Sequence, residues 1–154
     1  MSYSAQFIAN LFLGTAKGKG ATLTNMQVQK LVYYAHGYHL ALQGEPLISD
    51  EIKAWNFGPV IPPLYNDLKR FGNGVVTETI PGFEGTPDGF VVSLINKIFE
   101  LYGKIPGPRL SAATHTPGSP WDITYNKAKF SIIPNDLIKE YFKGKLLPAN
   151  ATAA

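Results

Sequence analysis

The chain has 154 residues, which is the size of one ordinary domain and is long enough to bury a substantial core. Hydrophobic residues make up 45% of the sequence and charged residues 16%, which excludes a disordered chain and favours a folded globular one. The formal net charge is +3 and cysteine is absent, so the composition excludes a disulfide framework, thiol catalysis and a thiolate metal site.

Targeting and charge signals predict a cytoplasmic protein that binds neither membranes nor nucleic acid. No apolar run approaches the roughly 20 residues that a membrane span needs, and the start MSYSAQFIAN lacks the basic segment and cleavage site of a signal peptide. The lysines near the end of the chain alternate with Asp136 and Glu140, which favours a solvated helix face over a nucleic-acid-binding face. These lysines are Lys127, Lys129, Lys139, Lys143 and Lys145.

The first predicted element is a short amphipathic helix from Ser4 to Leu13, because its apolar residues recur at helical spacing. The segment GTAKGKG, residues 14–20, then predicts a mobile connector. It differs from a phosphate-binding loop, since its glycine spacing is one residue short and Gly20 stands where serine or threonine holds magnesium.

The second helix has clear start and stop signals. Thr24 and Gln27 form a capping box, because each side chain can satisfy the free backbone N–H of the other residue. Gly44 ends the helix at the position where a left-handed glycine is common. Apolar residues lie on nearly all sides between these signals, so we expect a buried helix at the centre of the domain.

The middle of the chain predicts a small pair of β-strands. Residues Glu51 to Phe57 alternate in polarity as a short strand does, and Gly58-Pro59 predicts the turn that follows. The β-rich segment from Val75 to Ile80 is the expected pairing partner of residues 52–55.

Two helices are predicted on either side of that β-rich segment. One begins at Pro62-Pro63 and stops at Gly72, and it is expected to bury Leu64, Leu68 and Phe71. The other has Thr86 as its N-cap and Pro87 as its first residue, and Gly103 closes it.

The stretch LSAATHTPGSPW, residues 110–121, predicts a corner between two short helices. The first starts at Pro108 and is broken at residues 116–118. Ser119 then caps the second, with Pro120 as its first residue, and this wedges Trp121 where the two helices meet. The residues that the first helix is expected to bury are Leu110 and Ala113.

The last predicted helix runs from Pro134 to Phe142 and ends at Gly144. Residues 146–154 are predicted to be a disordered tail behind a single domain of residues 1–145. The elements together predict a mainly α fold: a compact single domain of about six or seven helices around a buried central helix, with a small β-strand pair.

Three histidines titrate near neutral pH by default. His36 and His39 lie three residues apart on the central helix, so a zinc site or a metal-dependent hydrolase could use both together with His115. Ser111 and His115 are a conceivable nucleophile and base, although no nucleophile elbow accompanies them. We favour buried histidines that hydrogen-bond to carbonyl or tyrosine groups, and we predict no metal, no cofactor and no catalytic residue.

Three blocks of sequence follow one another in order: NMQVQKLVYYAHGYHLALQGEPL, EIKAWNFGPVIPPLYNDLKRFG and LSAATHTPGSPWD. In these blocks the chain resembles the Panacea domain, the family of SocA-like antitoxins and related phage proteins. The resemblance covers residues 5–143. The matching positions are Gln29, Lys30, Leu31, Tyr33, Tyr34, Ala35, His39, Leu40, Ile52, Ala54, Trp55, Gly58, Pro59, Val60, Leu64, Tyr65, Leu110, Ser111, Thr114, His115, Pro120 and Trp121.

The resemblance implies an antitoxin that neutralises a toxin encoded beside it by binding that toxin directly, and not an enzyme. In the SocA branch the antitoxin also delivers its toxin to a ClpXP-type protease. A metal-dependent hydrolase that uses the histidines and a small nucleic-acid-binding regulator remain as alternatives.

The motif residues are bulky, aromatic or turn-forming, which favours scaffold roles over catalysis. Trp55, Tyr65, His115 and Trp121 are expected to form a cluster that joins the extended segment to the C-terminal helices.

For the toxin contact we predict a surface that includes Tyr34 and Phe83, because aromatic residues are enriched at interface centres. Tyr33, Tyr34 and Tyr38 project from the central helix in different directions, so at least one of them should reach the surface. Phe83 lies in a turn-rich loop that offers little to bury it.

Overall fold

The structure is a computed structural model that describes the backbone of residues 2–153 and the side chains of residues 2–145. Over these residues the chain forms seven α-helices, one 3-10 helix and one two-stranded sheet, which confirms the predicted mainly α class. In chain order the elements are α1 (Ala5–Gly18), α2 (Asn25–Gln43), β1 (Lys53–Trp55), β2 (Gly58–Val60), α3 (Pro62–Leu68), η1 (Lys69–Phe71), α4 (Gly89–Tyr102), α5 (Gly107–Thr114), α6 (Pro120–Lys127) and α7 (Asn135–Ala153).

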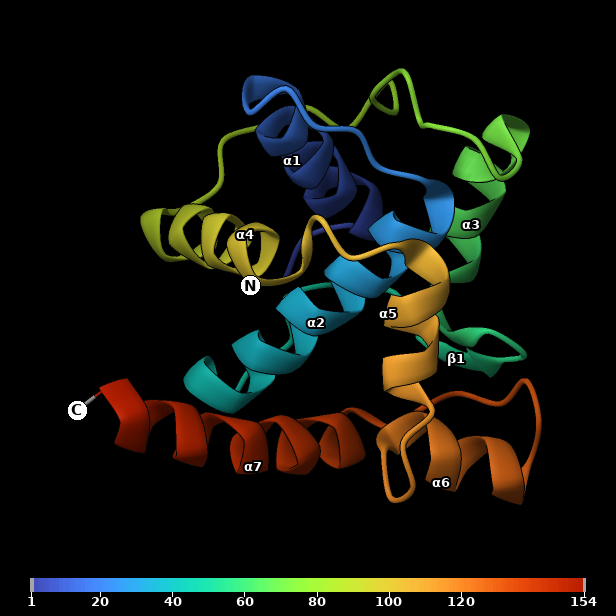
Figure 1. Ribbon diagram of the computed structural model, residues 1–154, viewed down its shortest axis with the longest axis vertical. Coiled ribbons are helices and arrows are strands. Elements are labelled where there is room, and N and C mark those ends of the chain that lie inside the picture. The colour runs from blue at the N-terminus through green and yellow to red at the C-terminus, as the bar shows by residue number, and fades with distance from the viewer. Residues whose placement is uncertain (1, 154) are drawn as a thin grey trace.

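Helix α2 is the centre of the molecule. Its capping box is present in both directions between Thr24 and Gln27, and Gly44 ends it in the left-handed conformation at φ 75°. The helix contacts α1, α3, α4, α5, α7 and β2, and Figure 1 shows it crossing the middle of the fold. The prediction of a buried central helix is therefore confirmed.

Helix α7 packs closely along α2, and a glycine makes this approach possible. A Cβ added at Gly37 would overlap the ring of Phe142, which is completely buried. The same ring meets Tyr33, Tyr34 and Tyr38 edge-on, so one α7 residue organises the aromatic face of α2. Helix α7 extends past Gly144, where the sequence predicts its end. The predicted disordered tail falls on residues whose side chains lie outside the described part, and it stays a prediction.

The small sheet is a hairpin with a different partner from the one predicted. Strand β1 pairs antiparallel with β2, in the register Lys53 to Val60 and Trp55 to Gly58. The turn therefore falls on residues 56–57, and Gly58-Pro59 belongs to β2. The predicted pairing with residues 75–80 is wrong, because a partner two residues away closes a shorter loop at lower entropic cost.

Two helix ends and the burial of one residue also differ from the predictions. Helix α1 continues through Gly14 to Gly18, because Ala16 in its last turn is buried against the core and this packing offsets the low helix propensity of glycine. Helix α4 is capped by Asp88, whose carboxylate accepts from the Val91 N–H at 2.9 Å, and not by Thr86. In α5, Leu110 is buried as predicted, whereas Ala113 is exposed.

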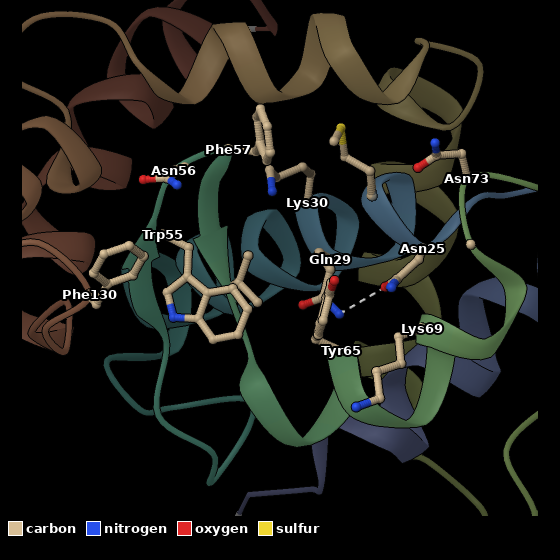
Figure 2. Close-up of a pocket in the computed structure, with 13 residues that line it drawn as sticks. Asn25, Gln29, Lys30, Trp55, Asn56, Phe57, Tyr65, Lys69, Asn73 and Phe130 are labelled. Carbon is tan, nitrogen blue, oxygen red and sulfur yellow. Dashed lines mark hydrogen bonds between the residues drawn. The ribbon is translucent and has the colours of Figure 1, made fainter.

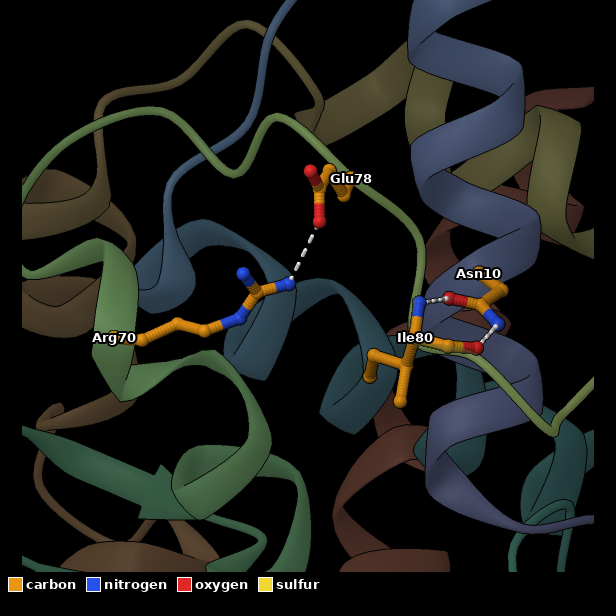
Figure 3. Close-up of polar contacts among 4 residues, drawn as sticks. All are labelled: Asn10, Arg70, Glu78 and Ile80. Carbon is orange, nitrogen blue, oxygen red and sulfur yellow. Dashed lines mark hydrogen bonds and ion pairs between the residues drawn. The ribbon is translucent and has the colours of Figure 1, made fainter.

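The long connection between η1 and α4 is hydrogen-bonded to helix α1. Asn10 on α1 accepts from the N–H of Ile80 at 2.7 Å and donates to its carbonyl oxygen at 2.9 Å (Figure 3). Arg70 pairs with Glu78 at 3.1 Å in the same segment, although both side chains are largely exposed and the pair contributes little stability. Within the described residues, no helix combines the length and apolarity required to cross a bilayer.

Candidate partner-binding site

The β1–β2 hairpin is held by three side chains that come from three different helices. Each donates to a backbone carbonyl oxygen of the hairpin, one in β1, one in the turn and one in β2. Trp121 Nε1 on α6 donates to Trp55 at 2.6 Å, Ser111 Oγ on α5 donates to Phe57, and Lys30 Nζ on α2 donates to Pro59 at 3.1 Å. The hairpin is therefore fixed against the helical core along one side.

Two further residues set the distance between the hairpin and the helices. Gln29 on α2 accepts from the N–H of Ile61 at 2.9 Å and so holds the start of α3. Gly58 adopts φ +108°, and a Cβ there would lie 2.6 Å from Thr114 Oγ1 and 3.0 Å from Lys30 Cε. Any other residue at this position would be strained and would push β2 away from α2 and α5.

The corner at residues 110–121 is built from local hydrogen bonds. Thr114 Oγ1 donates to the carbonyl of Ser111 at 2.6 Å, and Ser119 Oγ donates to the carbonyl of Thr114 at 2.8 Å. Ser119 also caps α6 by accepting from the N–H of Asp122, with Pro120 at the start of that helix as predicted. The ring of Trp121 then stacks on His115, with centroids 3.9 Å apart.

A pocket of about 360 Å³ opens between the hairpin, the first half of α2, and α3 with η1 (Figure 2). We call it the hairpin pocket. Its lining residues are Asn25, Met26, Gln29, Lys30, Trp55, Asn56, Phe57, Val60, Tyr65, Lys69, Gly72, Asn73 and Phe130. Two of them are lysines and none is acidic, so the described wall of the pocket is positively charged.

Exposed aromatic side chains surround the mouth of the hairpin pocket. Phe57 at the tip of the hairpin is 65% exposed, Phe130 is 50% exposed and Tyr65 is 37% exposed. The ring of Trp55 packs edge-on against Tyr65, with centroids 5.3 Å apart. Exposed aromatic residues around a concave site are typical of protein-binding surfaces, where such side chains become the energetic centre of the interface.

Comparisons with known proteins bear on the family of this chain. The family model for antitoxin SocA-like proteins, Panacea domain, matches residues 28–86, which include most of α2, the hairpin and α3. The chain is also 30% identical over 135 residues to antitoxin SocA of Caulobacter vibrioides (strain NA1000 / CB15N), across 81% of this chain and 72% of that protein. The chain belongs to the SocA-like antitoxin family. No solved structure matches it.

The segment matched by the Panacea model supplies almost the whole hairpin pocket. Only Asn25, Met26 and Phe130 among the lining residues lie outside residues 28–86. The family positions Gln29, Lys30, Gly58 and Pro59 are the residues that join α2 to the hairpin. In this member of the SocA-like antitoxin family they therefore have a structural explanation.

The structure does not bring the three histidines together. Among the described residues, no group of three or more His, Cys, Asp or Glu side chains is placed to hold a metal ion. His36 Nδ1 accepts from the N–H of Ile48 at 3.3 Å, and its Nε2 contacts Asn135 Oδ1 at 2.9 Å. His39 Nδ1 lies 2.7 Å from the carbonyl oxygen of Glu45. Ser111 donates to the hairpin and does not form the nucleophile pair with His115.

Burial lowers the pKa of three basic side chains. The pKa of His36 is lowered to about 4, chiefly by burial; the hydrogen bond to Asn135 opposes the shift, and the nearby His39 adds a smaller lowering. Burial also lowers the pKa of Lys30 to about 7. The pKa of His115 is lowered by burial and by the positive charge of Lys30, and its Nε2 has no hydrogen-bond partner among the described atoms.

The two residues predicted for the toxin contact lie in different surroundings. Tyr34 is 4% exposed and stacks on Tyr102 with centroids 4.5 Å apart, so the expectation that it reaches the surface is wrong. Tyr33 is also buried, and Tyr38 is the partly exposed member of the three. Phe83 is partly buried against the core and lines a separate, shallower pocket with Phe7.

Sequence reasoning missed the roles of Lys30, Phe57 and Phe130. A signal existed for Lys30, since it is a charged residue within a helix that is otherwise apolar on nearly all sides. Phe57 offered a weaker signal as an aromatic residue directly before a glycine and a proline. Nothing local indicated Phe130, which joins the pocket only because the segment after α6 returns to β1, where Ala54 accepts from its N–H at 2.9 Å.

Proposed function

We propose that this chain neutralises a toxin encoded beside it by binding that toxin directly, with the hairpin pocket and its aromatic rim as the contact surface. Two observations support the proposal: the relationship to antitoxin SocA and the ring of exposed aromatic side chains around one pocket. A surface of this kind can cover a toxin by burying Phe57, Tyr65 and Phe130 at the centre of an interface.

The first experiment is co-expression with the neighbouring reading frame. A neighbouring product that arrests growth alone, and is silent when this chain is co-expressed, would support the antitoxin function. Co-purification of the two proteins through a tag on one of them would support direct binding. A neighbouring product that is harmless alone, or is neutralised without any stable complex, would contradict the proposal.

A pair of matched substitutions locates the surface. Phe57→Asp should abolish neutralisation while the melting temperature stays unchanged, because the side chain is 65% exposed and removing an interface hot spot costs about 2 kcal/mol or more of binding energy. Phe83→Asp tests the loop surface that the sequence predicts. Loss of rescue in Phe83→Asp alone, with Phe57→Asp fully active, would move the contact surface to the loop.

The same proposal includes delivery of the toxin to a protease. If the chain also hands its toxin to a ClpXP-type protease, the half-life of the toxin in cells should shorten when this chain is present and lengthen again when the protease is deleted. A toxin half-life that is independent of the protease would leave neutralisation by masking alone.

A further inference from the structure

Lys30 places a buried amine beside the hairpin, with no carboxylate paired to it among the described residues. It is 1% exposed, and its described hydrogen bond goes to the carbonyl oxygen of Pro59 at 3.1 Å. An ammonium group has three donors, so this one hydrogen bond leaves two of them without a protein partner among the described residues. Within the described residues, the ion pairs found are Arg70–Glu78 and Glu140–Lys143, and no carboxylate pairs with Lys30. A buried charge in this state is expensive, because ions removed from water need compensation.

The hairpin pocket gives Lys30 access to a partner molecule. Lys30 is one of its lining residues, and Figure 2 shows the ammonium group on the hairpin side of the pocket beside Phe57. Lys69 at the same pocket adds a second positive charge, and no acidic side chain among the described lining residues opposes them. The side-chain amides of Asn25, Asn56 and Asn73 supply further polar groups.

The rest of the described wall is apolar and aromatic, which limits the chemistry of the occupant. Trp55, Tyr65 and Phe130 would enclose an apolar group, while Lys30 and Lys69 would attract a negative one. A carboxylate carried on a protein segment with neighbouring apolar side chains satisfies both requirements. Lysine binds a carboxylate strongly when the pair is removed from water, provided that the geometry fits.

We propose that the hairpin pocket accepts an acidic side chain of the toxin, flanked by apolar residues, and that Lys30 is the counter-ion of this side chain. The inference rests on the proposed antitoxin function and states which chemistry of the toxin the site recognises. Lys30 then has two roles: it holds β2 through Pro59 in the free protein, and it pairs with the incoming carboxylate in the complex.

Proton uptake provides a direct test on the unaltered protein. The pKa of Lys30 is about 7 in the free chain, so the amine is mostly neutral at pH 8.5. A carboxylate bound beside it stabilises the ammonium form and raises this pKa, so binding should take up close to one proton. Titration calorimetry at pH 8.5 with the product of the neighbouring reading frame, in two buffers of different ionisation enthalpy, measures this number.

Two variants test whether Lys30 is the group that takes up the proton on binding. Lys30→Met keeps an unbranched apolar chain as far as Cε and removes the amine, so it should abolish the uptake and weaken binding by about 30-fold or more, as expected when one partner of a buried charged pair is removed. Its melting temperature at pH 7 should be equal to or above that of the unaltered chain, because replacing a buried amine by an apolar group offsets the loss of the hydrogen bond to Pro59. Lys97→Met on α4, an exposed lysine away from the pocket, is the matched control and should change neither value.

A substitution scan of the acidic residues of the toxin should identify one Asp or Glu whose amide variant loses affinity only against the chain that retains Lys30.

Binding without proton uptake, together with unchanged affinity of Lys30→Met, would overturn this inference and leave the proposed function standing. Absence of any binding by the neighbouring product would overturn both. Inorganic phosphate that displaces the toxin at submillimolar concentration would show a general anion site and overturn the recognition of a carboxylate.

Discussion

Trp121 shows how a single side chain joins distant parts of this chain. It is 9% exposed, its Nε1 donates to the carbonyl of Trp55, and its ring stacks on His115 and Tyr125. The residue thereby connects the corner at residues 110–121 to the backbone of the hairpin. The corner at residues 110–121 thus holds the hairpin through Ser111 and Trp121.

Replacing Trp121 should therefore destabilise the fold. Trp121→Ala should lower the unfolding free energy by about 3–5 kcal/mol, because it removes a large buried side chain and leaves a cavity. Trp121→Phe retains most of the apolar contact and should lose less, about 1–2 kcal/mol, mainly for the unfilled Trp55 carbonyl. Urea denaturation measures both values. Equal stability of the alanine variant and the unaltered chain would show that Trp121 is not buried.

His36 makes the stability of the fold sensitive to acid. Its folded pKa is about 4, below the unfolded value of 6.5, so the unfolded chain takes up a proton first as the pH falls. Stability should be complete above pH 6.5 and should fall between pH 6.5 and 4 by on the order of 3 kcal/mol from this group. In His36→Gln, which does not titrate, unfolding measured over the same range should lack this component. Parallel pH profiles for the two proteins would rule out His36 as the cause.

At the scale of elements, helix packing determines whether a larger residue would fit in place of a helical glycine. Gly37 on α2 lies under the ring of Phe142 on α7, whereas Gly14 on α1 has no atom within 4 Å of the place where a Cβ would stand. Both are glycines inside helices, where alanine is intrinsically better by about 1 kcal/mol. Helix propensity alone would therefore predict that alanine stabilises the protein at both positions.

The two alanine variants should move stability in opposite directions. Gly37→Ala should destabilise the protein by about 1–3 kcal/mol, because the added methyl group forces α7 or Phe142 to shift. Gly14→Ala should stabilise it by up to about 1 kcal/mol, because the site is open. Thermal unfolding of both variants beside the unaltered chain provides the comparison. A stabilising Gly37→Ala would mean that α7 does not pack on α2 at this point.

For the whole molecule, the described core ends at Phe142. Ile138 and Phe142 are the completely buried residues by which α7 joins the core, and both precede residue 146. Removing residues 146–154 should therefore leave the midpoint and the slope of urea unfolding unchanged, which tests the predicted domain of residues 1–145. A lower midpoint in the shortened chain would place part of the core in the removed segment.

The sequence by itself determined the features whose partners are neighbours in the chain. The capping box of Thr24 and Gln27, the start of α6 at Ser119 and the end of α2 at Gly44 each depend on residues within a few positions, so local chemistry suffices to predict them. The burial of α2 followed from apolar residues on nearly all its sides. The family resemblance followed from three short blocks in a fixed order.

Only the tertiary structure decided the features whose partners are distant. Tyr34 is buried because Tyr102, far along the chain, stacks on it, and no helical pattern states which side of α2 a later helix will cover. The hairpin pocket exists because Lys30, Tyr65 and Phe130 come together from three separate segments. Among the described residues no carboxylate pairs with Lys30. Tertiary packing decides which carboxylates lie near this side chain, and the order of residues along the chain does not show it.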